Sequence, residues 1–408
     1  MKFIVGIVFL LFCHTTVSAQ RVCGTVMTSS SVDVNGVNTV NEYSRDTVPN
    51  EIINIPVIVH VLYKTVGQNI SDAQVISQIN ALNQDYRLKN ANAVNIPGVF
   101  KGLAADTKIN FCLAQVDPTG HITTGIVHKR TDTDYFLDES MKFSAMGGDN
   151  AWDSKKYLNI WVCYIFGRSL GFATPPGGPA DKDGVVINYD VFGTIGALRS
   201  PFDKGRTATH EIGHWLGLKH LWGDEDCGSD DVDDTPRQRF YNYNCPSFPH
   251  ATSCSPNANG DMFMNYMDFT DDACMSMFSQ GQKTKMRGLF SLKGARNSFL
   301  NSFACDASLA SAGPLPPDTI HAVKLIATAV EINIYPNPVT EIINVSSKDI
   351  LTLAGKTAAL FTTTGTLLMQ QILKSNVEKI NISRFAAGIY FLRIGQGNNL
   401  KIFKIIKM

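Results

Sequence analysis

Apolar positions divide the chain into segments of different periodicity. Residues Ile52 to Tyr63 (IINIPVIVHVLY) form a β-branched run, which is typical of a buried strand. After Ser71, a candidate N-cap, Val75, Ile79 and Leu82 recur at helical spacing, so a helix is expected from there to about Leu88. The pattern also predicts strands at Ile109–Val116, Lys156–Phe166 and Gly184–Tyr189, and a closing helix at Gln280–Leu292. This order favours a mixed α/β (α+β) domain with a twisted mixed sheet.

The C-terminal part has a different pattern of apolar and polar residues. Residues Ser308 to Thr319 (SLASAGPLPPDT) are small and proline-rich, as in a linker. Short alternating runs follow, at the spacing of a small all-β sandwich. These expected strands are Ile332–Tyr335, Ile342–Val345, Ala358–Thr362, Leu367–Ile372, Gly388–Ile394 and Leu400–Ile406.

Composition and the N-terminus indicate an exported protein. The chain has 408 residues, and its 36 basic residues equal its 36 acidic ones, without a basic run, which argues against nucleic-acid partners. Lys2, the apolar run Phe3–Phe12 and a small-residue site before Gln20 read as a signal peptide cleaved after Ala19. No later segment reaches the length of a transmembrane helix.

A histidine-rich segment, THEIGHWLGLKH, carries the chemistry. On a helix, His210 and His214 stand one turn apart on one face, where both can bind one metal ion. Glu211 lies beside them and can hold a reacting water without being a ligand. Gly217 permits the positive φ that ends a helix, and His220 follows as a third nitrogen donor. Three protein ligands with an open fourth position are typical of catalytic zinc.

The alternative is an amphipathic helix with surface histidines. It would explain neither Glu211 nor the break at Gly217. The complete spacing H-E-x-x-H-x-x-G-x-x-H is also far more constrained than H-E-x-x-H, and it is the metzincin signature.

Eight cysteines remain after the signal peptide, an even set that suggests disulfides in an exported protein. Two interpretations of Cys23, within Arg21–Thr25 (RVCGT), stay open. Its thiolate could cap the metal and keep a zymogen silent, or it could form an ordinary disulfide, for example with Cys305. The pairing of Cys112 and Cys163 is not determined by the sequence either.

Two features near the histidines have both a functional and an ordinary interpretation. The acidic stretch Asp230–Pro236 offers oxygen ligands of the kind calcium prefers, or it is a solvated loop. Met267 could form an apolar floor beneath the histidines, or it is plain core packing.

Together, the histidine motif, Met267 and the cysteine cluster resemble the pappalysin family of metzincin proteases, over about Ile52 to Ser302. The resemblance implies that zinc is held by three histidines, that Glu211 is the general base and that Met267 is the Met-turn residue. It further implies calcium at the acidic loop and a cysteine switch at Arg21–Thr25. The implied ligands and pairs are His210, His214 and His220 for zinc, Asp230, Asp234 and Thr235 for calcium, and the disulfides Cys227–Cys254 and Cys245–Cys274.

One position departs from the family pattern. The family usually has a tyrosine two residues after the Met-turn methionine, and here that residue is Phe269. Removing one oxyanion-type donor costs about 10²–10³ in rate. Tyr266 is the nearest phenol in the sequence.

The tail from about Ile332, with Tyr335-Pro-Asn-Pro and Gly388-Ile-Tyr, resembles the C-terminal sorting domain of type IX secretion substrates. This resemblance implies export by that machinery to the cell surface or medium. The expected parts are a signal peptide (1–19), a prosegment (20–50), a catalytic domain (51–305), a linker (306–330) and the sorting domain (331–408).

The sequence therefore predicts a secreted zinc endopeptidase acting on proteins or peptides. The alternative is a catalytically weak, metal-stabilised binding or adhesion protein exported by the same tail. Asp271 or Asp272 could lie near the substrate pocket and favour Arg or Lys. Cleavage near Ser44-Arg45 would then release the prosegment by self-processing.

Overall fold

The computed structural model describes residues 20–27, 51–250, 254, 259–302, 304–306, 332–347, 353, 356–362, 367–375, 377–394 and 401–408. The chain divides into two compact units, Met1–Pro314 and Leu315–Met408. The expected signal peptide and the Ser44-Arg45 cleavage point lie outside the described residues, as does most of the expected linker. No helix among the described residues is both long and apolar enough to cross a membrane.

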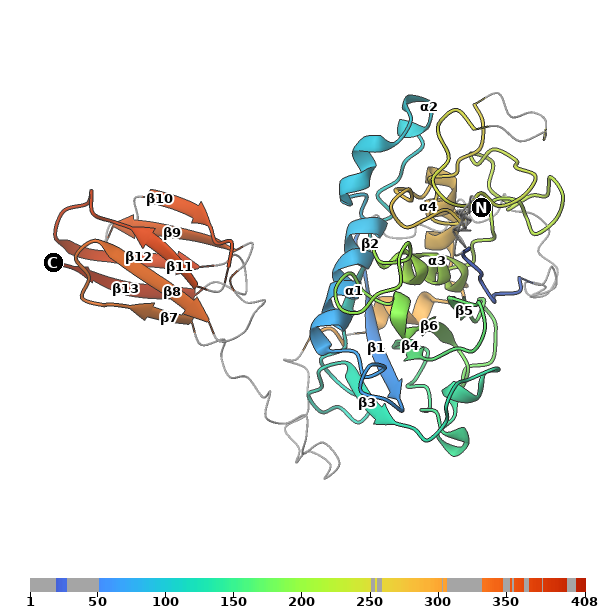
Figure 1. Cartoon of the computed structure of the whole chain (residues 1–408), viewed down its shortest axis with the longest axis horizontal. Coiled ribbons are helices and arrows are strands. Elements are labelled where there is room, and N and C mark those ends of the chain that lie inside the picture. The colour runs from blue at the N-terminus through green and yellow to red at the C-terminus, as the bar shows by residue number, and fades with distance from the viewer. Residues whose placement is uncertain are drawn as a thin grey trace, which may run out of the picture. The chain divides into compact units, whose positions relative to one another are not determined.

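A six-stranded mixed sheet organises the first unit (Figure 1). Its central strand β1 (Ile53–Tyr63) pairs in parallel with β2 (Ile109–Leu113) along its first half and with β3 (Ile126–Arg130) along its second. On its other side, β1 pairs with β4 (Leu158–Cys163), and β4 pairs with β6 (Gly184–Asn188), both in parallel. The antiparallel edge strand β5 (Gly171–Ala173) closes the order β2-β1-β4-β6-β5. This arrangement confirms the predicted mixed sheet.

Two helices pack on the sheet and on each other. Helix α1 (Asp72–Tyr86) begins at Ser71, whose side chain accepts a hydrogen bond from the Gln74 backbone, and it buries Val75 and Leu82. Helix α3 (Arg206–Trp215) lies against β5 and β6 and is buried over all ten residues (Figure 1). The histidine-bearing helix is therefore fixed between the sheet edge and α1.

The remaining elements of the first unit are short. Helix α4 (Gln280–Gly288) starts with a complete capping box, in which Ser279 and Gln282 satisfy each other's backbone N–H groups. Between α3 and α4, the described residues form turns and loops rather than strands. The other short helices are α2 (Gly98–Lys101), η1 (Ala91–Asn95), η2 (Ser140–Lys142), η3 (Ser144–Met146), η4 (Tyr189–Val191) and η5 (Asn297–Asn301).

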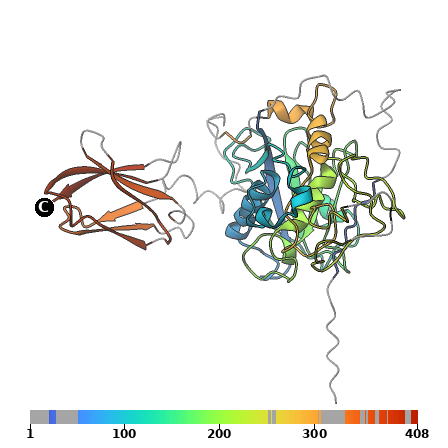
Figure 2. The same cartoon turned by 90° about the horizontal axis from the view of Figure 1, so that it is seen from above.

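The second unit is all-β, and Figure 2 shows its strands in two layers. One layer has the order β10-β9-β12-β13 and the other β11-β8-β7, all antiparallel. The strands are β7 (Ile332–Tyr335), β8 (Ile342–Ser347), β9 (Thr357–Thr362), β10 (Leu367–Ile372), β11 (Val377–Asn381), β12 (Gly388–Ile394) and β13 (Lys401–Lys407). A separate apolar core fills the space between the layers.

Three strands have no counterpart in the sequence-based prediction. Strand β5 has only three residues, and β3 and β11 carry charged residues and expose much of their surface. Edge strands of this kind lack the apolar run that marks a buried strand, so neither length nor periodicity identified them.

Candidate metal centre

Helix α3 owes its position to contacts at both of its ends. Gly205, its N-cap, has φ 77° and supplies no side chain. Instead, the Asp272 carboxylate accepts hydrogen bonds from the backbone N–H groups of Lys204 (2.8 Å) and Arg206 (3.2 Å). At the other end, Gly217 has φ 82°, and the Leu218 N–H donates to the Gly213 carbonyl (2.9 Å). The helix therefore ends sharply, as the glycine predicted.

That turn brings three imidazoles together. The Nε2 atom of His214 lies 3.1 Å from Nε2 of His210 and 3.0 Å from Nε2 of His220. All three side chains are buried. Burial first, and then the neighbouring histidines, lower the pKa of His210 and His214 well below the ordinary value, so both rings are neutral.

The hydrogen-bond partners of the Nδ1 atoms fix the tautomer of each ring and leave a lone pair on Nε2. Nδ1 of His210 lies 2.7 Å from the Tyr266 carbonyl oxygen, and Nδ1 of His214 lies 2.8 Å from the Leu218 carbonyl oxygen. A carbonyl only accepts, so each Nδ1 carries the proton and each Nε2 is bare. Bare nitrogens facing each other at this distance repel unless a cation lies between them. Tetrahedral zinc with bonds of about 2.0–2.1 Å would hold such nitrogens about 3.3 Å apart, so the residues fit the ion.

His220 is oriented by a side chain that the sequence reasoning missed. Its Nδ1 lies 2.5 Å from Oδ1 of Asp224, four residues further along the chain. Carboxylates in this position fix the ring and raise its basicity toward a metal. The only signal in the sequence was an acidic residue closely following the third histidine.

Cys23 completes the cluster. Within the described residues, Cys23, His210, His214 and His220 are the one set of such side chains whose candidate ligand atoms all lie within 4.8 Å of one another. The thiol also lies 3.3 Å from Glu211 Oε2. Burial and the nearby Glu211 raise the pKa of the Cys23 thiol well above its usual value.

Glu211 is held by the same N-terminal segment. Thr25 Oγ1 donates to Glu211 Oε2 (2.9 Å) and accepts from the Ala173 N–H (2.8 Å). Burial raises the pKa of Glu211 to about 7, against the opposing effects of Thr25, Cys23 and Arg21.

The N-terminal segment 20–27 lies along the edge strand β5, where Figure 1 shows it in dark blue. The Leu170 N–H donates to the Val22 carbonyl, and the Gly24 N–H donates to the Gly171 carbonyl, each at 2.9 Å. Segment and strand run in parallel at Cys23 and Gly171. An extended chain therefore lies along the β5 edge of the sheet and carries Cys23 to the histidines.

Arg21 is buried beside the cluster, with an exposed fraction of 3%. Its guanidinium pairs with the Asp272 carboxylate, donates to Thr207 Oγ1 (3.1 Å) and lies 5.1 Å from the centre of the Phe202 ring. Asp272 is fully buried, whereas Asp271 is partly exposed and contributes its backbone N–H to Asn244. Of the two expected carboxylates, Asp272 is therefore the one that forms an ion pair with the Arg21 guanidinium.

Met267 lies beneath the histidine helix. A Cβ on Gly213 would come within 2.5 Å of the Met267 sulfur, so the absence of a side chain at 213 permits this close packing. Phe269 covers the cluster from another side, with its ring centre 5.0 Å from that of His220 and 5.6 Å from that of His210.

Tyr266 does not replace the phenol missing at Phe269. Its hydroxyl donates to Asp85 Oδ1 (2.8 Å), and its side chain is fully buried below the helix. Burial raises the pKa of Asp85 to about 6, although Arg206, Thr209 and Tyr266 oppose that shift.

The carboxylates of the acidic loop accept hydrogen bonds from protein groups in this structure. Asp234 accepts from Ser279 Oγ (2.6 Å) and from the Gly281 N–H (2.8 Å), so it also caps α4. Asp230 accepts from Thr235 Oγ1 (2.8 Å). Burial raises the pKa of Asp230 to about 7.

Three disulfides connect the described residues. They pair Cys227 with Cys254 and Cys245 with Cys274, the same pairs that the family resemblance implies, and Cys112 with Cys305. The interpretation that Cys23 forms a disulfide with Cys305 is wrong, because Cys112 occupies that partner and Cys23 carries a free thiol. Cys163 is also free, within the apolar core.

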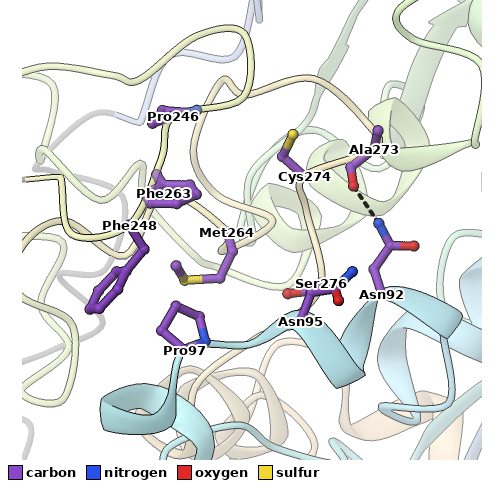
Figure 3. A pocket seen from close by; sticks show the side chains of 10 residues that line it. All are labelled: Asn92, Asn95, Pro97, Pro246, Phe248, Phe263, Met264, Ala273, Cys274 and Ser276. Carbon is purple, nitrogen blue, oxygen red and sulfur yellow. Dashed lines mark hydrogen bonds between the residues drawn. The ribbon is translucent and has the colours of Figure 1, made fainter.

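A separate hollow of about 280 Å³ contains none of the clustered histidines (Figure 3). Figure 3 shows Pro97, Phe248 and Met264 toward one end and Asn92, Asn95 and Ser276 toward the other, with Asn92 donating to the Ala273 carbonyl. It is therefore not the reaction centre.

Two family models match the chain. Residues 144–291 match a peptidase family described as pregnancy-associated plasma protein-A. Residues 333–408 match the secretion system C-terminal sorting domain, which indicates type IX export.

Individual relatives agree with the models. An extracellular metalloprotease of Colletotrichum graminicola is 30% identical over 303 residues, covering 70% of this chain and 96% of the relative. Mature mirolysin of Tannerella forsythia, solved in complex with a cleaved peptide, is 48% identical with a TM-score of 0.62, covering 64% of this chain and 100% of that one. Promirolysin of the same organism is 48% identical with a TM-score of 0.63, covering 66% and 89%.

These likenesses include the histidine helix and nearly the whole length of the relatives. They favour a peptidase over the alternative of a catalytically weak binding or adhesion protein, because the matched family and the named relatives are metalloproteases. The chain therefore belongs to the pappalysin family, as a metalloendopeptidase that is exported through a type IX sorting domain.

Proposed function

We propose that the catalytic metal is zinc, held by Nε2 of His210, His214 and His220. The observation that carries this assignment is the convergence of three nitrogens, of which two are left bare by carbonyl contacts at Nδ1. When bound, zinc polarises a scissile carbonyl and lowers the pKa of water to about 7.

Glu211 is the general base in this proposal. It lies on the same helix, between the two ligand histidines in sequence, and its carboxylate reaches the side of the cluster where Cys23 lies. Glu211 takes the proton from the attacking water and passes it to the leaving amine. Met267 supports the ligands from below.

The test is Glu211→Ala. The variant should retain about one zinc per chain, measured by metal analysis, while casein cleavage falls to background. Undiminished cleavage would exclude Glu211 as the base, and loss of zinc together with activity would leave Glu211→Gln as the decisive variant.

The N-terminal segment keeps the enzyme latent in this proposal. Cys23 takes the fourth ligand position, Thr25 holds Glu211, and the backbone of Val22 and Gly24 occupies the substrate edge of β5. Replacing Cys23 with Ala should give measurable peptidase activity in the unprocessed chain. If the unprocessed variant is as inactive as the unprocessed wild type, the cysteine switch is contradicted. N-terminal sequencing of the mature form tests release near Arg45.

Substrate preference for Arg or Lys follows from the Arg21 contacts. The pocket offers a buried carboxylate, a hydroxyl and an aromatic face to a guanidinium, and it would be vacated with the prosegment. Asp272→Asn should reduce kcat/KM for peptides with Arg or Lys after the scissile bond far more than Asp271→Asn, its matched control. Equal effects of the two changes would contradict the assignment.

Calcium binding at Asp230, Asp234 and Thr235 is a separate part of the proposal, supported by the burial of the Asp230 carboxylate beside Thr235. Calcium should raise the melting temperature of the wild type but not of Asp230→Asn. A calcium effect equal in both proteins would place the ion elsewhere.

A further inference from the structure

We propose that the segment Phe240–Pro246 forms a second side-chain subsite, which takes an aromatic or bulky apolar residue of the peptide substrate. This inference rests on the proposed peptidase function and extends it, because it concerns a surface outside both the histidine cluster and the Asp272 pocket.

A continuous aromatic layer leads from the metal ligands to this segment. Trp222 stacks on His220, with ring centres 4.4 Å apart and planes 5° apart. Phe269 packs against Trp222 at 4.9 Å, and Tyr241 packs against both, at 5.2 Å from Phe269 and 5.5 Å from Trp222.

The rings of this layer nearest the histidines are buried, and those furthest from them are exposed. Trp222 and Phe269 are 7% and 8% exposed, whereas Tyr241 and Tyr243 are 40% and 49% exposed. The two tyrosine rings lie 6.3 Å apart. Exposed aromatic rings that continue the lining of a reaction centre are available to a substrate bound there.

Three residues of the segment are held by contacts with Asp268, Asp271 and Cys274. The Asn242 backbone N–H and side-chain amide both donate to the Asp268 carboxylate, at 2.7 and 2.8 Å. The Asn244 carbonyl accepts from the Asp271 N–H (2.9 Å), and Cys245 is bonded to Cys274. These contacts hold the segment in place, which gives a side-chain subsite the rigidity that specificity requires.

The exposed rings border a hollow of about 460 Å³, lined by Phe240–Pro246 and His250. It is distinct from the hollow in Figure 3, with which it shares only Pro246. Such a volume is within the range of ligand-binding clefts and accommodates one large side chain.

The lining of the hollow favours an uncharged aromatic occupant. The Arg239 guanidinium lies 5.3 Å from the centre of the Phe240 ring, but it is paired with the Asp226 carboxylate at 2.9 and 3.1 Å, so the tyrosine rings dominate the lining. Aromatic side chains gain from offset or edge-to-face contacts with tyrosine rings. The hydrogen bond between the Asp271 N–H and the Asn244 carbonyl joins the hollow's lining to the residue before Asp272, so the hollow lies close to the contacts of Arg21 in the fold.

The test uses the full chain after its own processing, with bound zinc measured. Peptides with Arg after the scissile bond carry either Phe or Gly at each of the three positions on either side. At one position, we expect Phe to raise kcat/KM about 3- to 10-fold over Gly in the wild type. Tyr241→Ala and Tyr243→Ala should bring this ratio close to one, while Tyr241→Phe should preserve it.

Tyr135→Ala is the matched control, because Tyr135 is 41% exposed and packs on Phe166 in the same way, with ring centres 4.6 Å apart. It should keep the Phe/Gly ratio of the wild type. If Tyr241→Ala loses zinc, Tyr243→Ala decides the question, because the Tyr243 ring packs on Tyr241 and lies one ring further from the histidines than Tyr241 does.

Two results would overturn the inference: no position with a Phe preference, or a Phe preference that survives both alanine changes. Failure of the proposed function has a different signature. In that case even the glycine peptides would not be cleaved, or their cleavage would be insensitive to a zinc chelator.

Discussion

Each imidazole of the cluster is oriented by an acceptor on its outer nitrogen, but the acceptors differ in kind. His210 and His214 face backbone carbonyls that belong to the fold, whereas His220 faces the side chain of Asp224. A substitution can therefore remove the hydrogen-bond acceptor of His220 alone, because a backbone carbonyl cannot be removed by mutation. The contribution of this acceptor to metal binding is thus measurable.

Asp224→Asn should lower zinc affinity about 10- to 100-fold, because the ring of His220 loses a carboxylate that fixes its orientation and raises its basicity. Competition with a chromophoric chelator measures the change. Glu225→Gln, at the neighbouring exposed residue, is the control and should leave the affinity unchanged. Equal affinities in Asp224→Asn and the wild type would show that Asp224 is dispensable.

Asp149 gives a pH-dependent prediction away from the centre. Burial opposes its ionisation, but hydrogen bonds and charges from His60 and then Lys129 lower its pKa to about 2 from 3.8. The pKa of Asp149 is lower in the folded state than in the unfolded chain, so its ionised carboxylate stabilises the folded state. This contribution is complete above about pH 4, is lost as the pH falls through about 2, and amounts to roughly 2 kcal/mol of unfolding free energy.

Asp149→Asn should therefore destabilise the first unit at pH 7 by more than at pH 3. Tryptophan fluorescence reports this unit alone, because all four tryptophans lie in it. Asp132→Asn, at an exposed position, is the control. A destabilisation that is independent of pH would contradict the assigned pKa.

At the scale of elements, the centre depends on how closely α3 approaches the segment that carries Met267. The helix is anchored at its start by Asp272, ends at Gly217, and is in contact with β5, β6 and α1. At Gly213, a Cβ would come within 2.5 Å of the Met267 sulfur. The spacing of these elements thus depends on a single missing side chain.

Gly213→Ala should destabilise the first unit by about 1–3 kcal/mol through overpacking, despite the better helix propensity of alanine. The urea midpoint, followed by tryptophan fluorescence, measures this loss. Gly98→Ala, in a short helix with no atom within 4 Å of the new Cβ, should be neutral or slightly stabilising. In a Met267→Ala background, Gly213→Ala should cost less than it does in the wild type, and an equal cost would place the strain elsewhere.

At the scale of the whole molecule, chemistry and export belong to separate units. The described residues of the second unit have their own core and their own two sheets. The matched sorting domain begins after the division between the units. Each unit therefore has what it needs to fold independently.

A chain that ends at Pro314 should keep kcat/KM for short peptides and the same thermal midpoint by tryptophan fluorescence, but it should no longer be exported. Culture fractions tested with an antibody against the first unit measure export. A truncated protein that melts well below the full chain would show that the second unit stabilises the first.

The sequence by itself determined the zinc-type motif, the central strand, the export tail and the family. These features depend on local spacing or on one long apolar run, which a linear pattern preserves. The His-x-x-x-His interval, the break at Gly217 and the return to His220 all lie within twelve residues, so helix geometry alone brings them together.

Only the tertiary structure decided which distant groups complete the site. Asp272 faces Arg21 across 251 residues of chain, Cys23 reaches histidines almost 190 residues away, and Tyr266 bonds to Asp85 instead of replacing the lost phenol. The edge strand β5 was also beyond prediction, because three residues carry no periodicity. Contacts of this kind result from the packing of elements that are remote in sequence, so the spacing of residues in a short motif cannot predict them.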